Sequence, residues 1–259
     1  MEWNDSALVL RLGRFREADI WLKILTRRHG IVSAFAFGGS RSRRRFVACL
    51  ETLNEIRINA RGSRSGQYLV LQEGVLVKSP QRLRRDWKRY GMFMNCIRFL
   101  EVLGVPPDGT TGAWELTKST LAFLEQAAAV HSLFPMLFRF RLACEQGYAP
   151  LLGTCSVCGR ELSGNAFFRV AEGTLTCGDC LPPGGLAVPL SGESLALLRR
   201  VQTLPPEMWF EPDGSANAAG SVGQFAFTPE NRRECVRAIE GFVQYHLGLV
   251  WDNGRFRRA

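Results

Sequence analysis

Two cysteine pairs carry the clearest chemical pattern in the chain. Cys155 and Cys158 form one C-x2-C pair, Cys177 and Cys180 form a second, and 18 residues separate the pairs. Each pair can form a turn whose two sulfurs point at one ion, and four thiolates complete a tetrahedron of ~2.3 Å bonds to zinc. Because four cysteines leave no coordination position for water, the spacing predicts one structural Zn²⁺ in an insertion at about residues 150–186.

The competing interpretation is a pair of redox disulfides, since a single C-x-x-C pair also occurs in thiol oxidoreductases. Two pairs at this spacing favour a metal site instead. The N-terminus is acidic rather than a basic secretory leader, and no stretch approaches the ~18–20 apolar residues of a membrane-spanning helix. We therefore expect a cytosolic protein without membrane contact, where reducing conditions favour metal-bound cysteines over disulfides.

No arrangement of residues predicts catalysis. The sequence has no G-x-x-x-x-G-K-[ST] loop and no G-x-G-x-x-G turn between a strand and a helix, so we expect no nucleotide cofactor. The three histidines are isolated and have no partner at a metal-binding offset. We expect a non-enzymatic protein in which the four isolated cysteines are small core residues: Cys49, Cys96, Cys144 and Cys235.

Basic residues are concentrated in the first third of the chain. Residues 1–90 contain 19 Lys/Arg against 8 Asp/Glu, a net charge of +11, whereas residues 91–259 contain 14 against 16, a net charge of −2. Such a field attracts phosphate backbones by releasing condensed counterions. A solvated face that only maintains solubility is the alternative. The uneven distribution favours one nucleic-acid-binding module.

The densest basic run follows Gly38-Gly39 and comprises Arg41, Arg43, Arg44 and Arg45. A flexible arginine loop beside a sheet can hold backbone phosphates without reading sequence. Arg57, Arg61 and Arg64 provide a further flank. The other predicted DNA-binding cations lie before the loop or in the helix after the sheet: Arg14, Arg16, Lys23, Arg27, Arg28, Arg82, Arg85 and Arg89.

Four aromatic residues in the same region are candidates for stacking on bases. They are Phe15, Trp21, Phe35 and Phe37, although Phe35 could instead point into the core. Stacking tolerates any sequence because every base has a flat face. The combination predicts general affinity for single strands and for duplex, without base-edge readout in the major groove.

The predicted fold class is α+β, with a five-stranded OB-fold barrel at residues 1–78 followed by an α-helical domain at residues 79–259. Alternation is clearest where Ile20, Leu22 and Ile24 share one face. Five strands is the number in an OB-fold, but the strand pattern alone does not exclude an SH3-like barrel. The expected strands span 7–12, 19–26, 31–37, 52–60 and 67–77.

The helical domain is expected to begin at Ser79 as N-cap, with one helix to Leu103. Its predicted buried stripe includes Leu83, Trp87 and Ile97. Arginines at its N-terminus oppose the helix dipole, so we interpret them as phosphate contacts. Further helices are expected at 111–129, 133–146, 193–203 and 230–249, with a Gly/Ser/Ala-rich loop at 212–223.

Several segments together resemble the bacterial recombination mediator family RecO. They are Ala7-Leu8-Val9-Leu10, the stretch from Glu17 to Ala34, the arginine loop ending at Phe46, Phe138 to Pro150, and Cys155-x-x-Cys158-Gly159. The similarity spans nearly the whole chain in the same order. The Gly-Tyr-x-Pro segment leading into the first cysteine pair is the most specific part.

The resemblance implies an N-terminal OB-fold joined to a helical domain with a zinc ribbon. RecO-like proteins bind single- and double-stranded DNA, anneal complementary strands, and act with RecR to help RecA replace single-stranded DNA-binding protein. By the same resemblance, the helical domain receives the acidic, hydrophobic C-terminal tail of that binding protein, with Arg139 and Arg141 as possible contacts. The implied location is cytoplasmic and nucleoid-associated.

Two segments depart from the family pattern. The family usually has a basic residue where this chain has Phe37, so the stacking role of Phe37 rests on its side chain alone. Leu50-Glu51-Thr52-Leu53 lacks the Gln-Pro-Phe that is common in relatives. These departures affect the expected DNA surface rather than the fold.

Two other functions compete with a DNA-binding mediator. An RNA- or ribosome-associated module would use the same phosphate contacts, since 2′-hydroxyl readout has no sequence signature here. A zinc-dependent nuclease would need an open coordination position on the metal, and four cysteines leave none.

Overall fold

The structure is a computed structural model that describes residues 2–184, 186–210 and 228–258. The chain forms two compact units. The first, which we call the barrel unit, contains Met1–Ile97 and Gly104–Gln126, and the second, the helical unit, contains Arg98–Leu103 and Ala127–Ala259. The loop predicted at 212–223 lies outside the described residues.

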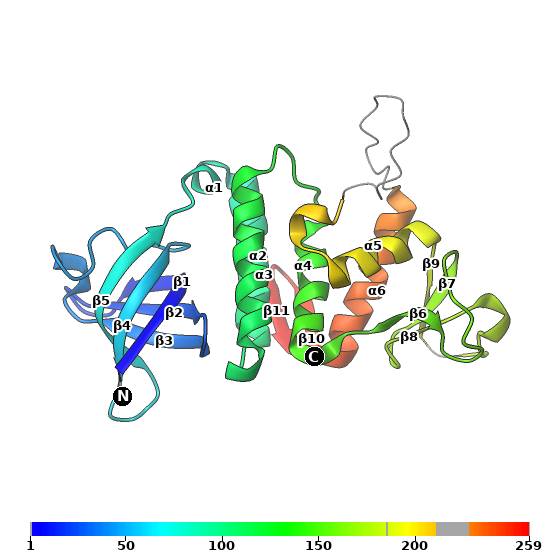
Figure 1. The fold of residues 1–259 in the computed structure, drawn as a ribbon, viewed down its shortest axis with the longest axis horizontal. Helices are drawn as coiled ribbons and strands as arrows, with labels where there is room; N and C mark the ends of the chain where they lie inside the picture. The colour runs from blue at the N-terminus through cyan, green and yellow to red at the C-terminus, as the bar shows by residue number, and fades with distance from the viewer. Residues whose placement is uncertain (1, 185, 211–227, 259) are drawn as a thin grey trace. The chain divides into compact units, whose positions relative to one another are not determined.

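Five strands of the barrel unit form a closed barrel, drawn from blue to cyan in Figure 1. The strand order is β1-β2-β3-β5-β4, and the β3–β5 pair is parallel, with Ala34 opposite Leu69. This is an OB-fold, so the predicted α+β class and barrel type are confirmed. The strands are β1 (Glu2–Arg14), β2 (Ile20–Thr26), β3 (Gly30–Ala36), β4 (Glu55–Gly62) and β5 (Leu69–Lys78).

Alternating side chains of β2 close the barrel core. Ile20, Leu22 and Ile24 point inward and are buried, as predicted, whereas Trp21 and Lys23 are half-buried on the outer face. Burying each large aliphatic side chain contributes about 1.5–3 kcal/mol relative to leaving it exposed. The inner face therefore fixes which side chains of β2 and its neighbours face solvent.

The fourth strand starts later than predicted. Residue Leu53 has a φ of +70°, and the Asn54 side chain donates to the carbonyl oxygens of Ala48 (3.1 Å) and Cys49 (3.2 Å). These interactions fold the chain into a loop, so β4 begins at Glu55 rather than at Thr52. The prediction was wrong here because the Asn54 contacts are not visible in a strand pattern.

Two helices replace the single helix predicted from Ser79 to Leu103: α1 (Gln81–Arg85) and α2 (Trp87–Leu103). Asp86 between them has an extended backbone, and its carboxylate accepts from the N–H groups of Lys88 and Arg89, both at 3.1 Å. Asp86 thereby starts α2. Consequently Trp87 is 78% exposed and does not join the predicted buried stripe.

Helix α3 (Thr110–Gln126) completes the barrel unit, and three helices form the framework of the helical unit. These are α4 (Phe134–Ala143), α5 (Gly192–Thr203) and α6 (Pro229–Leu247), which pack against one another (Figure 1). Helix α4 ends earlier than predicted because the chain continues as a wide turn, Cys144–Tyr148, in which Gly147 has a φ of +91°. No helix among the described residues combines the length and apolar character that a bilayer-crossing segment needs.

The cysteine insertion is a small four-stranded sheet rather than an irregular segment. Its strand order is β6-β8-β7-β9. The sheet connects α4 to α5, and β9 packs against α5 and α6. Its strands are β6 (Leu151–Cys155), β7 (Ala166–Arg169), β8 (Thr174–Thr176) and β9 (Ala187–Leu190).

A C-terminal hairpin, β10 (Leu249–Asp252) and β11 (Arg255–Arg258), was not predicted. Its two turn residues, Asn253 and Gly254, have φ values of +45° and +78°. Asn-Gly is the preferred pair for a two-residue turn with both φ values positive. The hairpin signal was therefore present in the sequence.

Candidate nucleic-acid interface and metal centre

The arginine loop, residues 41–45, lies beside the loop that connects β1 to β2. Gly38 donates its N–H to the Asp19 carboxylate (2.8 Å), and Ser40 donates its N–H to the Ala18 carbonyl oxygen (3.0 Å). The φ of +69° at Gly38 turns the chain toward these partners. The two loops therefore share one end of the barrel.

The loop arginines differ in how far they are engaged within the protein. Arg45 donates to the Phe37 carbonyl oxygen (2.8 Å), and its guanidinium lies 5.2 Å from the Phe46 ring centroid. Arg41 forms an exposed ion pair with Glu17 at 3.3 Å, which contributes little in water. Arg43 and Arg44 are exposed and have no ion-pair or hydrogen-bond partner among the described residues.

Four aromatic side chains gather at the same end of the barrel: Phe15, Phe35, Phe37 and Tyr68. The Phe35 ring is at the centre, with centroid distances of 5.2 Å to Phe15, 6.1 Å to Phe37 and 5.0 Å to Tyr68. Phe15 is 53% exposed and Phe37 is 40% exposed. The face of strands 2 and 3 and the loops L12 and L45 is where OB-folds bind oligonucleotides, and these residues lie there.

Of the predicted stacking residues, Phe35 and Trp21 lie next to each other on the outer face of the barrel. Phe35 is half-buried on the outer face rather than in the core, because its neighbours Ala34 and Ala36 point inward. Trp21 lies opposite Phe35 across the β2–β3 pair and is packed closely over Gly13. Tyr68 was not anticipated, although an aromatic residue two positions after Gly66 of the hairpin turn was a usable signal.

The cations of β1 and β2 fall into two groups. Arg14 and Arg16 lie at the arginine-loop end, where the Arg16 guanidinium is 5.4 Å from the Phe15 ring centroid. Arg27 and Arg28 follow the other end of β2, and Lys23 lies between the groups. The predicted DNA-binding cations therefore lie near both ends of β2, with Lys23 as the one predicted cation between them.

The DNA-binding arginines predicted on α1 and α2 also fall into two groups, exposed and internally bonded. Arg82 and Arg85 are exposed, and the N–H groups of Arg82 and Leu83 donate to the Glu125 carboxylate at 2.9 and 2.8 Å. The negative charge of Glu125 at the N-terminus of α1 offsets the unfavourable interaction of the nearby arginines with the helix dipole. Arg89 instead forms an ion pair with Asp86 (3.0 Å) and donates to the Leu124 carbonyl oxygen (3.2 Å).

The four cysteines of the insertion lie together. Their sulfur atoms are all within 4.8 Å of one another, and the sulfurs of Cys158 and Cys177 are 3.9 Å apart. Tetrahedral zinc with ~2.3 Å bonds places its ligand sulfurs about 3.8 Å apart. The donor set therefore fits one thiophilic metal ion, and among the described residues it is the one group found with this property.

Backbone amides favour the charged form of one ligand. The N–H groups of Cys158 and Cys177 lower the pKa of Cys155 to about 6, and the Cys177 N–H lies 3.4 Å from the Cys155 sulfur. The pKa of Cys180 is instead raised to about 12, first because its thiol donates a hydrogen bond to Cys177. A bound cation would replace that last proton.

The isolated cysteines behave differently. Cys49, Cys96 and Cys235 are buried, as expected, and Cys144 is half-buried. Burial raises the pKa of Cys49 to about 11 and those of Cys144 and Cys235 to about 12. These thiols are protonated and unreactive at neutral pH.

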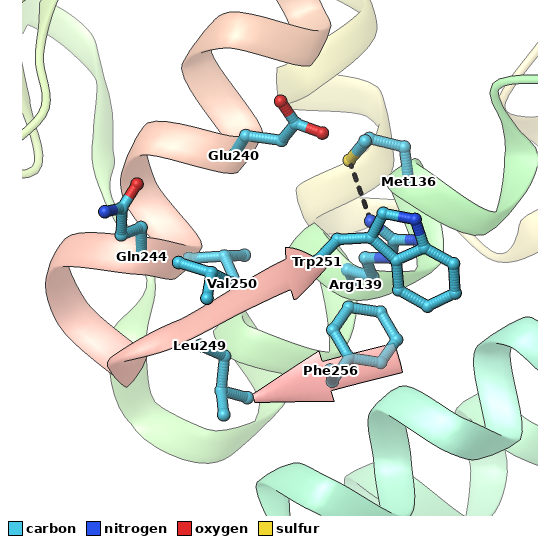
Figure 2. A pocket seen from close by; sticks show the side chains of 9 residues that line it. Met136, Arg139, Glu240, Gln244, Leu249, Val250, Trp251 and Phe256 are labelled. Atoms are coloured by element: carbon cyan, nitrogen blue, oxygen red, sulfur yellow. Dashed lines mark hydrogen bonds between the residues drawn. The ribbon is translucent and has the colours of Figure 1, made fainter. Parts of the chain in front are cut away.

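The two arginines proposed as partner contacts lie in different environments. Arg141 is held inside the helical unit, by Glu145 at 2.7 Å and by the carbonyl oxygens of Val201 (3.0 Å) and Leu204 (3.1 Å). Arg139 lines a cavity of about 240 Å³ between α4, α6 and the C-terminal hairpin (Figure 2). Its guanidinium is 5.3 Å from the Trp251 ring centroid and 4.6 Å from that of Phe256.

Comparisons with known proteins agree with this architecture. The family model "Recombination protein O N terminal" matches residues 1–80, and "Recombination protein O C terminal" matches residues 84–255. The "DNA repair protein RecO" of Nitratidesulfovibrio vulgaris (strain DP4) is 49% identical over the full length of both chains. The protein of the same description from Lawsonia intracellularis is 44% identical over the full length of both chains. That from Streptomyces coelicolor is 30% identical over 95% of this chain and 94% of its own. These matches confirm the resemblance found in the sequence motifs.

Proposed function

Because the chain belongs to the RecO family of DNA repair proteins, with a role in DNA repair and recombination, we propose that it is a non-enzymatic mediator. It binds single- and double-stranded DNA and anneals complementary strands. With RecR, it helps RecA load onto single-stranded DNA coated by single-stranded DNA-binding protein. The observation that carries the proposal is the aromatic cluster beside uncommitted arginines on the OB-fold face.

The arginine loop supplies the affinity for DNA in this proposal. Arg43 and Arg44 have no internal partner among the described residues, so their guanidinium groups are available to backbone phosphates. Each neutralised phosphate releases condensed counterions, and binding should weaken as salt increases. Phe15, Phe37 and Tyr68 then stack on unpaired bases without selecting a sequence.

Annealing follows from the same two contacts. Two single strands repel each other through their phosphates, and arginines that neutralise both backbones remove that repulsion. The strands stay close long enough for base pairing to select matching partners. No bond is made or broken by the protein, which is why we propose no catalytic step.

The pocket at Arg139 suits the tail of single-stranded DNA-binding protein. An acidic, hydrophobic C-terminus needs apolar contacts and a cation. Trp251, Phe256 and Leu249 provide the apolar contacts and Arg139 the cation, while Glu240 and Gln244 also line the cavity. Arg141 was a second candidate for this contact. Since Glu145 and two carbonyl oxygens already hold Arg141, we propose that Arg139 makes the contact and that Arg141 supports the helices.

We propose that Zn²⁺ occupies the four-cysteine cluster and stabilises the small sheet. Cys155 and Cys158 would hold it from the end of β6, and Cys177 and Cys180 from the segment after β8. Four thiolates leave no open position for a reacting water. A DNA-repair role also implies that the protein acts in the compartment that contains the chromosome, bound to the nucleoid.

An annealing assay tests the proposal directly. Complementary strands precoated with single-stranded DNA-binding protein are mixed with the parent protein or with Arg43→Glu/Arg44→Glu. We expect rapid annealing with the parent and little with the variant. Arg233→Glu/Arg237→Glu on α6 is the matched control, because it changes the net charge equally outside the barrel unit, and it should anneal like the parent.

Three results would decide against the proposal. If the parent fails to anneal coated and naked strands alike, the protein is only a generic basic protein. If it prefers RNA in competition with a matched DNA oligonucleotide, the RNA-binding alternative holds. Metal-dependent cleavage of labelled single-stranded DNA, abolished by a folded Cys155→Ser variant, would instead support a nuclease.

A further inference from the structure

A small cleft lies on the outer face of the barrel where β1, β4 and the β2–β3 turn meet. Ser6 on β1 is directly opposite Arg57 on β4, and the Ser6 carbonyl oxygen accepts from the Arg27 N–H at 2.9 Å. Because neighbouring strands are ~4.8 Å apart, the two arginines flank Ser6 on either side. The small side chain of Ser6 leaves a cavity of about 320 Å³ between them.

The two flanking arginines are not engaged within the protein. Both Arg27 and Arg57 are exposed, and neither guanidinium has an ion-pair or hydrogen-bond partner among the described residues. The nearest acidic residue on β4, Glu55, is already paired with Lys118 at 2.8 Å. Two like charges beside one cavity repel each other unless an anion lies between them.

A third arginine is fixed at the edge of the cleft by a buried carboxylate. Asp5, whose side chain is 3% exposed, accepts from the N–H groups of Ser6 (2.8 Å) and Arg28 (3.1 Å). It also pairs with the Arg28 guanidinium at 3.5 Å, and Arg28 donates to the Asn4 carbonyl oxygen. Asp5 thus holds Arg28 in place, and the cleft lining keeps a net positive charge.

We propose that this cleft is a phosphate-binding subsite for nucleic acid, with Arg27 and Arg57 as its ligands and Arg28 at its edge. A phosphate has several acceptor oxygens, and guanidinium groups from two sides satisfy them with charge-assisted hydrogen bonds. The ligand is either a terminal phosphate monoester or an internal phosphodiester. Both offer the same anionic oxygens to the cleft.

The subsite is separate from the aromatic cluster. Ile20 begins β2 beside the arginine loop, and Thr26 ends it beside Arg27, so the two sites lie about 20 Å apart at ~3.3 Å per residue. The inference rests on the proposed function in taking nucleic acid as the source of the phosphate. It goes beyond that function by assigning a second, concave anion site away from the usual OB-fold face.

Inorganic phosphate is the first probe. In the full-length protein, the Nε–Hε NMR signals of Arg27, Arg28 and Arg57 should shift and saturate as phosphate is added. Arg27→Gln/Arg57→Gln should abolish the shift of Arg28, whereas the matched Arg61→Gln/Arg64→Gln variant, which removes the same charge from the β4–β5 hairpin, should keep it. Non-saturating shifts, or equal shifts at Arg64 and other exposed arginines, would overturn the subsite.

Oligonucleotides with and without a 5′-phosphate identify the source. A loss of affinity in Arg27→Gln/Arg57→Gln that is confined to the 5′-phosphorylated strand indicates a terminal group. An equal loss for both strands, with the salt slope reduced by about 1 because the two arginines share one phosphate, indicates an internal phosphodiester. Unchanged affinity for both strands overturns the inference.

The two proposals can fail separately in these experiments. If the parent binds DNA and Arg43→Glu/Arg44→Glu does not, but Arg27→Gln/Arg57→Gln binds like the parent, the cleft proposal fails while the proposed function stands. If the parent binds no DNA yet the cleft arginines bind inorganic phosphate with saturation, the function fails while the anion site stands.

Discussion

The exposed loop arginines of the barrel unit and Arg199 of the helical unit serve different purposes. In the barrel unit, Arg43 and Arg44 are exposed and have no partner among the described residues. In the helical unit, Arg199 donates to the carbonyl oxygens of Leu152 (2.5 Å), Gly153 (3.0 Å) and Leu162 (2.5 Å), tying α5 to the small sheet. Residue type alone therefore does not identify a ligand-binding arginine; the partners of its guanidinium do.

Metal removal should give the largest effect and should be confined to the helical unit. Structural zinc sites contribute roughly 10–16 kcal/mol of apparent binding free energy at pH 7, because the site does not exist in the unfolded chain. Chelation should therefore unfold the sheet β6–β9 and lower the thermal unfolding temperature of that unit. Hydrogen exchange would show it, and amides of the barrel should keep their protection.

Acid should release the metal, as chelation does. Thiolates bind metal and thiols do not, and the pKa of Cys155 is lowered to about 6. Protons compete with the metal for all four sulfurs, so metal retention should be highest at alkaline pH and should decline as the pH is lowered. If one metal per chain is retained unchanged to pH 4, or if no metal copurifies at pH 8, the assignment of the cluster is wrong.

Arg199→Met should be the next largest change. It keeps the apolar stem of the side chain but removes the donor to the carbonyl oxygens of Leu152 and Leu162, at about 1–3 kcal/mol for each one that stays buried. The Gly153 oxygen still accepts from the Leu162 N–H at 3.2 Å. We expect the free energy of unfolding to fall by about 3 kcal/mol with DNA affinity unchanged. Arg237→Met, on the exposed side of α6, is the matched control and should change neither quantity.

Arg43→Glu/Arg44→Glu should have the opposite effect to Arg199→Met: DNA affinity should fall and stability should stay the same. Reversing two phosphate-facing charges should weaken binding to unrelated DNA sequences about 100-fold at low salt, which corresponds to ~2.7 kcal/mol. The unfolding temperature should stay the same because these side chains have no internal partner among the described residues. Fluorescence polarisation measures the DNA affinity and thermal melting the unfolding temperature. A variant that is destabilised but still binds DNA would contradict the contrast between these loop arginines and Arg199.

Phe37→Ala should have the smallest effect. Removing one stacking ring costs about 1–3 kcal/mol per base, and neighbouring Phe15 and Phe35 remain. We expect roughly a fivefold loss at the low end of that range for single strands and no change for blunt duplex. Phe37→Leu keeps the apolar contact without the flat ring, so it should resemble Phe37→Ala if stacking matters and the parent if it does not.

The sequence predicted the features that depend on local pattern. Alternation of Ile20, Leu22 and Ile24 identified the buried face of β2, the number of strands indicated a small barrel, and the cysteine spacing identified the cluster. It did not predict the break at Asp86, because the carboxylate must be seen accepting two backbone N–H groups. It also did not separate Arg44 from Arg89, since the partners of an arginine come from distant segments such as Leu124.

The slope of log affinity against log salt is the measurement that tests the central claim most directly. It should be determined for single-stranded DNA with the parent, with Arg43→Gln/Arg44→Gln, and with Arg233→Gln/Arg237→Gln. If the exposed arginines of the barrel hold phosphates, the first variant should lose about 1.4 from the slope, because each phosphate of a single strand contributes about 0.7, and the second about 0. Equal slopes for all three proteins, or a loss only in the helical-unit variant, would contradict the account.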